Sequence, residues 1–248
     1  MSTPVGVSPR MNIDRIVQQG GVWGPMECSN SIDKLGRICQ ERNIHQYRYK
    51  GVVNILPLAM VDDILVVNEC GLKSVETNSF IDTHISMKRL RFHTPDVTGK
   101  SKCHHIHVGT KNKWCPELKV HGTLMKKVEN DTYLGDIIEG SGSNEMNIKN
   151  RVSKGNGIVS QIFNILNNVP FGPNYFKVAL LLRESLLISS ILSNAEVWYG
   201  ITDKEIKLLE AVDIGFFRQL FKVPHTTPHC AFYLETGSIK LGTLHKND

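Results

Sequence analysis

The apolar residues of this chain follow two different patterns, one on each side of residues 140–143. Before Gly140, short apolar runs alternate with glycine, proline and charged residues, which is typical of strands and helices joined by turns. After Ser143, apolar residues recur every three or four positions over long segments, which is typical of amphipathic helices. The pattern predicts an α+β domain at residues 1–140, an all-helical bundle at 147–235 and a C-terminal tail at 236–248.

In the first half, the pattern predicts a helix, a hairpin, a second helix and a small antiparallel sheet. Cys28, Ile32, Leu35 and Cys39 lie at helical spacing in a segment that ends by Asn43. The other elements predicted here are an amphipathic helix at residues 71–90 and strands at residues 102–108, 118–120 and 132–138.

Three helices are predicted in the second half, at residues 148–166, 175–198 and 204–221. Proline and glycine residues bound each of them. Thr202 and Glu205 have the spacing of a capping box, which marks the start of the last helix. No strand pattern occurs between these segments, and this favours a helical bundle.

Two adjacent carboxylates, Asp62 and Asp63, interrupt the apolar run at residues 58–67. The β-branched flanks predict strands, and a tight turn between them would place both aspartates at the tip of a hairpin. Adjacent like charges disfavour each other's ionisation, so the pair suggests a bound cation. Mg²⁺ is the natural candidate because it prefers oxygen ligands. The alternative is a surface hairpin whose turn contains aspartates only because they are common turn residues.

The composition is that of an ordinary globular protein, with 248 residues, 41% of them apolar and 21% charged. The first ten residues contain no apolar signal segment, and the apolar stretch at residues 178–192 is interrupted by Arg183 and Glu184. We therefore expect no membrane partner and an intracellular protein, in the nucleus or cytoplasm, that is not secreted. Its six cysteines are expected to be reduced thiols.

Positive charge is concentrated between Met87 and Lys127. This segment has ten basic and two acidic residues, a difference of +8, whereas the whole chain carries only +5. Such a concentration is the pattern expected of a surface that faces phosphate groups, with Lys100, Lys111 and Lys113 as candidate contacts to a nucleic-acid backbone. The alternative is a solvated face of lysines.

Two further patterns are candidates for binding sites. Gln19 and Gly20 begin a glycine-rich loop ahead of the first helix, and such loops present backbone amides to phosphate groups or to a base pair. Cysteine and histidine are the usual ligands of structural zinc, although the spacing in this chain fits no common zinc finger. The residues of that possible zinc site are Cys103, His105, His107 and Cys115.

Four motifs, taken in order and spacing, resemble the second half of a reverse transcriptase. They are Gln19-Gly20 with Pro25 five residues on, Met60-Val61-Asp62-Asp63, Lys102-Cys103, and Tyr133-Leu134-Gly135. The similarity is to the polymerase of non-LTR retrotransposons, which are transposable elements. The segment from Asn194 to Trp198 is similar to a Gly-Ala-Glu-x-Trp motif of many such elements. The resemblance covers about residues 17–235.

The resemblance implies a partial polymerase palm with a small antiparallel sheet, followed by a helical thumb. It also implies RNA-directed DNA polymerase activity, a nucleotidyltransferase reaction with an RNA template, a DNA primer, a deoxynucleotide and Mg²⁺. By the same resemblance, Gln19 and Gly20 support the template and the incoming nucleotide, and Asp62 and Asp63 are catalytic metal ligands. Lys102 is the proton donor to pyrophosphate. The primer grip is formed by Tyr133, Leu134 and Gly135.

Departures from the family pattern limit what the resemblance implies. Met60 stands where the family has tyrosine or phenylalanine, and Val61 where alanine is common. The family has a further metal-binding aspartate well upstream of the glycine-rich loop, whereas eighteen residues precede Gln19 and Asp14 is too close to it. We therefore expect a polymerase fragment that is inactive alone. The alternative is a non-catalytic nucleic-acid-binding module derived from the same ancestor.

Overall fold

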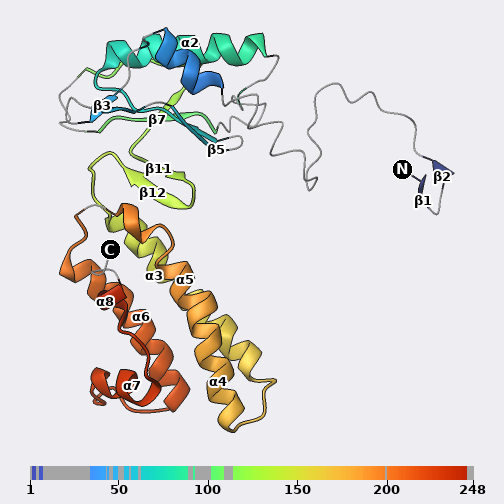
Figure 1. Cartoon of the computed structure of the whole chain (residues 1–248), viewed down its shortest axis with the longest axis vertical. Helices are drawn as coiled ribbons and strands as arrows, with labels where there is room; N and C mark the ends of the chain where they lie inside the picture. The colour runs from blue at the N-terminus through green and yellow to red at the C-terminus, as the bar shows by residue number, and fades with distance from the viewer. Residues whose placement is uncertain are drawn as a thin grey trace. The chain divides into compact units, whose positions relative to one another are not determined.

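The computed structural model forms two compact units (Figure 1). The first comprises Met1–His105 and Lys111–Lys127, and the second comprises Ile106–Thr110 and Val128–Asp248. The structure describes residues 2–3, 6–7, 34–42, 44, 47–49, 53–55, 57–60, 63–88, 92, 102–108, 114–198 and 200–244. Mixed helices and small sheets confirm the predicted α+β class.

The strands of the first unit are short and form antiparallel hairpins. A connection of two residues joins β5 to β6 and β8 to β9, and such short connections require tight turns. The pairs are β1 (Ser2–Thr3) with β2 (Gly6–Val7), β3 (Tyr47–Tyr49) with β4 (Val53–Ile55), β5 (Leu58–Met60) with β6 (Asp63–Leu65), and β8 (Lys119–Val120) with β9 (Thr123–Leu124).

Two helices cover one side of the strands β3 to β6 (Figure 1). Residues 34–41 are helical, and α2 spans Gly71–Met87, so both predicted helices are confirmed where the structure describes them. Leu35 packs with Ile81 and Ile85 of α2 in the core of this unit. The apolar residues of α2 do not all face this core, because Val75 and Met87 are 41% and 77% exposed.

The chain passes from the first unit to the second through β7 (His104–Ile106) and β10 (Lys126–Val128), which pair with each other. The next two strands are β11 (Asn130–Tyr133) and β12 (Asp136–Glu139), and they form an antiparallel hairpin. The prediction of a single strand at residues 132–138 was therefore wrong. Leu134 and Gly135 adopt φ angles of 48° and 90°, which turns the chain back at this point.

The rest of the second unit is helical. No strand follows β12 among the residues that the structure describes, as the sequence predicted. In the same part of the chain, no helix is both long and apolar enough to cross a bilayer. The helices are α3 (Glu145–Leu166), α4 (Pro173–Leu182), the π-helix η1 (Arg183–Ile188), α5 (Ser189–Ile191), the 3₁₀ helix η2 (Ala195–Val197), α6 (Asp203–Phe221), α7 (His229–Thr236) and α8 (Leu241–Leu244).

Helices α3 and α6 cross closely in the core of this unit. Gly155 permits the approach, because a Cβ at that position would lie 3.0 Å from Val212. Phe216 and Phe217 of α6 are fully buried in this core, and Trp198 belongs to the same core with 6% of its surface exposed.

The predicted helix at residues 175–198 was too long. The helical segment begins at Pro173, continues through η1 and ends with α5 at Ile191. Asn194 then adopts a left-handed conformation with a φ of 60°, which an α-helix does not allow.

A buried ion pair connects this segment to α6. Arg183 donates two hydrogen bonds to Asp213, from Nε to Oδ1 at 2.6 Å and from Nη2 to Oδ2 at 2.7 Å. The Tyr233 hydroxyl of α7 also donates to Asp213 Oδ2, at 3.2 Å. Burial and the neighbouring Asp213 charge raise the pKa of Tyr233, so its hydroxyl remains a donor. One carboxylate thus holds η1, α6 and α7 together.

We expect Thr202→Ala to lower the free energy of unfolding by about 1 kcal/mol, measured by urea unfolding. Thr202 Oγ1 accepts a hydrogen bond from Glu205 N at 3.3 Å, and Glu205 accepts one from Thr202 N at 2.8 Å, which completes the capping box. Ser160→Ala is the control, because Ser160 is exposed on α3 and its hydroxyl bonds the carbonyl of Asn156 within the same helix. Equal losses in both variants would show that the cap contributes nothing specific.

Candidate functional site

The β5–β6 hairpin carries the predicted acidic pair. Met60 pairs with Asp63, and only Val61 and Asp62 stand between these two paired residues in the sequence. Asp63 begins β6 with an exposed side chain, and Ile64, the next residue, packs against the core of the first unit. Asp62 itself lies outside the described residues, and Mg²⁺ binding by the pair stays a prediction.

The other site residues predicted in the first unit are mostly outside the described part of the chain. Lys102 is described, and it is exposed two residues before β7. Its role as a proton donor stays a prediction. Five residues fall outside the description, and their roles also stay predictions: Gln19, Gly20, Lys100, Lys111 and Lys113.

The residues considered for zinc do not form a metal site. Cys115 Sγ lies 3.7 Å from His105 Nε2. Among the described residues, which include Cys103 and His107, no group of three histidine, cysteine, aspartate or glutamate side chains could hold a metal ion. The contact between Cys115 and His105 is therefore a local packing feature of the first unit.

The predicted primer-grip residues form the tip of the β11–β12 hairpin. Tyr133 ends β11, Leu134 and Gly135 make the turn, and the Leu134 side chain is 45% exposed. Both turn carbonyls accept hydrogen bonds from the helical part of this unit. Asn194 Nδ2 donates to Leu134 O at 3.2 Å, and Arg151 Nη2 donates to Gly135 O at 3.5 Å.

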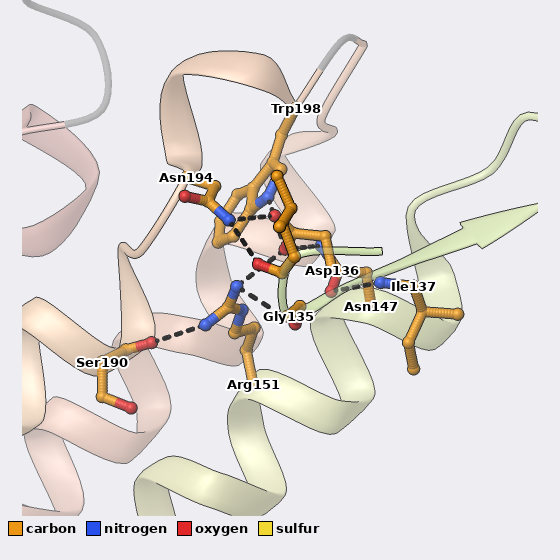
Figure 2. Close-up of polar contacts among 9 residues, drawn as sticks. Gly135, Asp136, Ile137, Asn147, Arg151, Ser190, Asn194 and Trp198 are labelled. Carbon is orange, nitrogen blue, oxygen red and sulfur yellow. Dashed lines mark hydrogen bonds and ion pairs between the residues drawn. The ribbon is translucent and has the colours of Figure 1, made fainter. Parts of the chain in front are cut away.

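The residue after the turn, Asp136, is the centre of a polar cluster (Figure 2). Its Oδ1 accepts hydrogen bonds from Arg151 Nη2 at 2.7 Å, from Asn147 Nδ2 at 2.9 Å and from Trp198 Nε1 at 3.3 Å. Its Oδ2 accepts one from Asn194 Nδ2 at 2.7 Å. The side chains of Asp136 and Arg151 are 15% and 5% exposed, so this ion pair is largely removed from water.

The donors around Asp136 are held by contacts of their own. Arg151 Nη1 donates to the carbonyl of Ser190 at 3.0 Å, which connects α3 to α5 (Figure 2). The Arg151 guanidinium also lies 5.8 Å from the ring centroid of Trp198, within the range of a cation–π contact. Asn147 Oδ1 accepts the backbone N–H of Ile137 at 3.3 Å. The cluster therefore joins the hairpin, α3, α5 and the Asn194 segment.

The charge of Asp136 is stabilised by these donors. Burial is the largest single influence and raises the pKa of Asp136, but the hydrogen bonds from Arg151, Asn194 and Asn147, with the Arg151 charge, outweigh it. The net result is a pKa below the ordinary value of 3.8. A carboxylate that already accepts four hydrogen bonds is suited to hold groups in place, not to exchange protons.

The sequence contained a signal for this cluster that motif matching missed. The buried positions of α3 follow helical spacing, and Arg151 occupies one of them between Ile148 and Gly155. A charged residue on an apolar stripe needs a buried partner of opposite charge. Asp136 directly follows the motif Tyr133-Leu134-Gly135, so searching near the motif for that partner would have found it.

We expect Asp136→Asn to lower the free energy of unfolding by about 3 kcal/mol at neutral pH, because it leaves the Arg151 charge buried without a counterion. The pKa of Asp136 is lowered by folding, so its contribution is complete above the ordinary value of 3.8 and is lost as the pH falls below it. Urea unfolding from about pH 7 to about pH 3 should show the free energies of unfolding of the wild type and of Asp136→Asn approaching each other at the acid end.

The control for this pH series is Glu145→Gln. Glu145 forms an exposed ion pair with Lys149, with 2.6 Å between Oε1 and Nζ. Exposed pairs contribute little to stability, so this variant should follow the wild type at every pH. A gap between the wild type and Asp136→Asn that stays constant down to about pH 3 would contradict the role assigned to the Asp136 charge.

Comparison with known proteins found no relative of this chain. No protein-family model matches the chain, and no curated protein or solved structure is significantly similar to it. The case for a function therefore depends on the motifs and on the contacts described above.

Proposed function

We propose that this chain is part of an RNA-directed DNA polymerase of a non-LTR retrotransposon. In this proposal the first unit contributes the metal-binding hairpin of a palm, and the second contributes the primer grip and the thumb. The observation that carries the proposal is the β5–β6 hairpin, whose two-residue connection contains Asp62 and is followed directly by Asp63.

The hairpin is suited to hold two carboxylates near one cation. Asp63 begins β6 at the connected end of the paired strands with its side chain exposed, and Asp62 directly precedes it in the sequence. Ile64 and Val66 pack against the core beneath, which anchors β6. Carboxylate oxygens are the ligands that Mg²⁺ prefers, so this donor set fits the ion. When bound, Mg²⁺ would stabilise the charge on the attacking and leaving oxygens of a phosphoryl transfer.

Other residues of the first unit would bind and orient the substrates. Gln19 and Gly20 would support the template base and the incoming deoxynucleotide. Lys102 is exposed and would donate a proton to the departing pyrophosphate. The basic segment between Met87 and Lys127 would neutralise phosphates of the RNA template and the DNA primer.

A second observation supports the proposal from the other unit. The Tyr133-Leu134-Gly135 motif and the Asn194–Trp198 motif were both selected by resemblance, and they lie about 60 residues apart. Asp136 accepts hydrogen bonds from both Asn194 and Trp198, and Asn194 also bonds the turn carbonyl of Leu134. Two motifs that share one set of contacts are expected to serve one function.

The resemblance requires a third carboxylate on a strand upstream of the glycine-rich loop. Residues 1–248 contain no aspartate at that spacing, and Asp14 is too close to Gln19. Positioning of two ions supplies most of the catalysis in such a reaction, so Asp62 and Asp63 alone would hold the ions too loosely. We propose that polymerisation needs the upstream strand joined to this chain.

We expect residues 1–248 alone to give no primer extension on an RNA template with Mg²⁺. The same residues joined to an upstream polymerase segment that carries the aspartate strand should extend the primer. Asp62→Ala in the joined protein should abolish extension, because it removes a metal ligand. Template-dependent extension by residues 1–248 alone would refute the requirement for the upstream strand.

We expect binding of a primed RNA template to weaken and to depend less on salt when Lys100, Lys102, Lys111 and Lys113 are replaced by alanine. Each lost phosphate contact should reduce the slope of log K against log salt by about 0.9. The measurement is fluorescence anisotropy with a labelled duplex over a series of salt concentrations. The control is the matched alanine replacement of exposed lysines of the second unit, Lys154, Lys177, Lys204 and Lys207.

Equal slopes in the wild type and in the first variant would show that the basic segment is a solvated surface. Equal reductions in both variants would show that overall charge, and not this segment, determines binding. Binding by the wild type with no polymerase activity in the joined protein would favour the alternative, a non-catalytic nucleic-acid-binding module.

A further inference from the structure

We propose that Asp136 and Asn194 are positioning residues that fix the 133–135 turn to the helices of the second unit. The turn and the Asn194–Trp198 segment then keep a fixed position relative to each other, and local unfolding exposes both of them together. The contacts of Asp136 and Asn194 with the turn, called the link below, do not depend on the proposed function. The identification of a primer strand as the partner held at this turn rests on the proposed function.

The two strands that carry the turn are too short to fix its orientation by themselves. β11 and β12 form a sheet of only two strands, and an isolated two-stranded hairpin is marginally stable in water. The Leu134 side chain at its tip is 45% exposed and contributes little burial. The orientation of the tip therefore depends on polar contacts with neighbouring elements.

Those contacts reach the turn from two directions and meet at one carboxylate. Asn194 Nδ2 bonds both Leu134 O, at 3.2 Å, and Asp136 Oδ2, at 2.7 Å. Arg151 Nη2 bonds Asp136 Oδ1 at 2.7 Å and lies 3.5 Å from Gly135 O. Asp136 thus orients the two donors that hold the turn carbonyls. Because the donors belong to α3 and to the segment after α5, a shift of either moves the turn.

Asn194 combines two properties that can be separated by mutation. Its backbone has a φ of 60°, a conformation that asparagine and glycine tolerate better than other residues. Its side-chain amide supplies the hydrogen bonds to Leu134 and Asp136. The similar motif of retrotransposon polymerases has glycine at this position, which would satisfy the backbone but could not donate to the turn. Asn194→Gly therefore removes the link without straining the backbone.

The link has a consequence for anything that binds at the turn. A partner that contacts Leu134 or Gly135 meets a surface whose position is set by α3 and by the Asn194–Trp198 segment. Under the proposed function, the primer strand would be held at a constant position relative to the helices of the second unit. Loss of the link should weaken binding of a primed template more than binding of the unprimed strand.

The test is native-state hydrogen exchange of the full chain. In Asn194→Gly, exchange protection of residues 134–137 should fall by about tenfold while protection of α6 stays unchanged. The Ile137 amide is a specific reporter, because Asn147 accepts its hydrogen bond while donating to Asp136. The indole N–H resonance of Trp198 should also shift, because this group donates to Asp136.

Two further variants separate the link from general stability. Asn194→Asp keeps the side-chain shape but replaces the donor by a carboxylate close to Asp136, so it should lose protection at least as strongly as Asn194→Gly. Lys222→Gly is the matched control, because Lys222 also has a left-handed backbone, with a φ of 53°, at the end of α6. It should leave both the turn protection and the Trp198 resonance unchanged.

Unchanged protection at residues 134–137 in both Asn194 variants would overturn the proposal. Loss of protection that is equal in the turn and in α6 would also overturn it, because it would mean a general loss of stability. Binding of primed and unprimed RNA is measured on the same samples. If the wild type binds neither, the proposed function fails, while the exchange result still decides the link.

Discussion

The second unit depends on the rule that a buried carboxylate must be paired. Asp136 is paired with Arg151, and Asp213 with Arg183. Removing two charges from water costs several kcal/mol per ion, so the pair is tolerated only where further hydrogen bonds complete it. Completing these two sites brings together elements that are distant in sequence. Asp136 thereby joins the β11–β12 hairpin to α3, and Asp213 joins η1 to α6 and α7.

In the first unit, too, polar side chains of a helix hold a turn between two short strands. Asn78, Asp82 and Ser86 lie four residues apart on α2, so they share one face of the helix. Asn78 donates to the carbonyl of Lys119, and Asp82 accepts the backbone N–H of His121 at 3.0 Å. The β8–β9 turn is therefore held by a helix face, as the 133–135 turn is held in the second unit. In both places the strands are too short to position the turn by themselves.

Local signals in the sequence were sufficient to predict the helices but not the turns between them. The periodicity of α3 and the capping box at Thr202 depend on neighbouring residues, and both were predicted. The turn at Leu134 was missed because leucine does not signal a positive φ. The end of the helix at Ile191 was missed for a related reason, since Asn194 is held by groups about 60 residues away. Contacts across such a distance leave no local pattern.

The two hairpins that carry the candidate site residues share one geometric property. Successive side chains of a strand point to opposite faces, so an exposed residue is followed by one that faces the protein. Exposed Asp63 is followed by Ile64, which packs on the core. In the other hairpin the turn at Leu134 and Gly135 interrupts the alternation, and Asp136, the first residue of β12, bonds Arg151. In both hairpins the exposed residue near the tip and the residue that anchors the tip are therefore near neighbours in the sequence. Under the proposed function, a substitution at Ile64 or Asp136 would act on binding through the position of the tip and not through direct contact with the ligand.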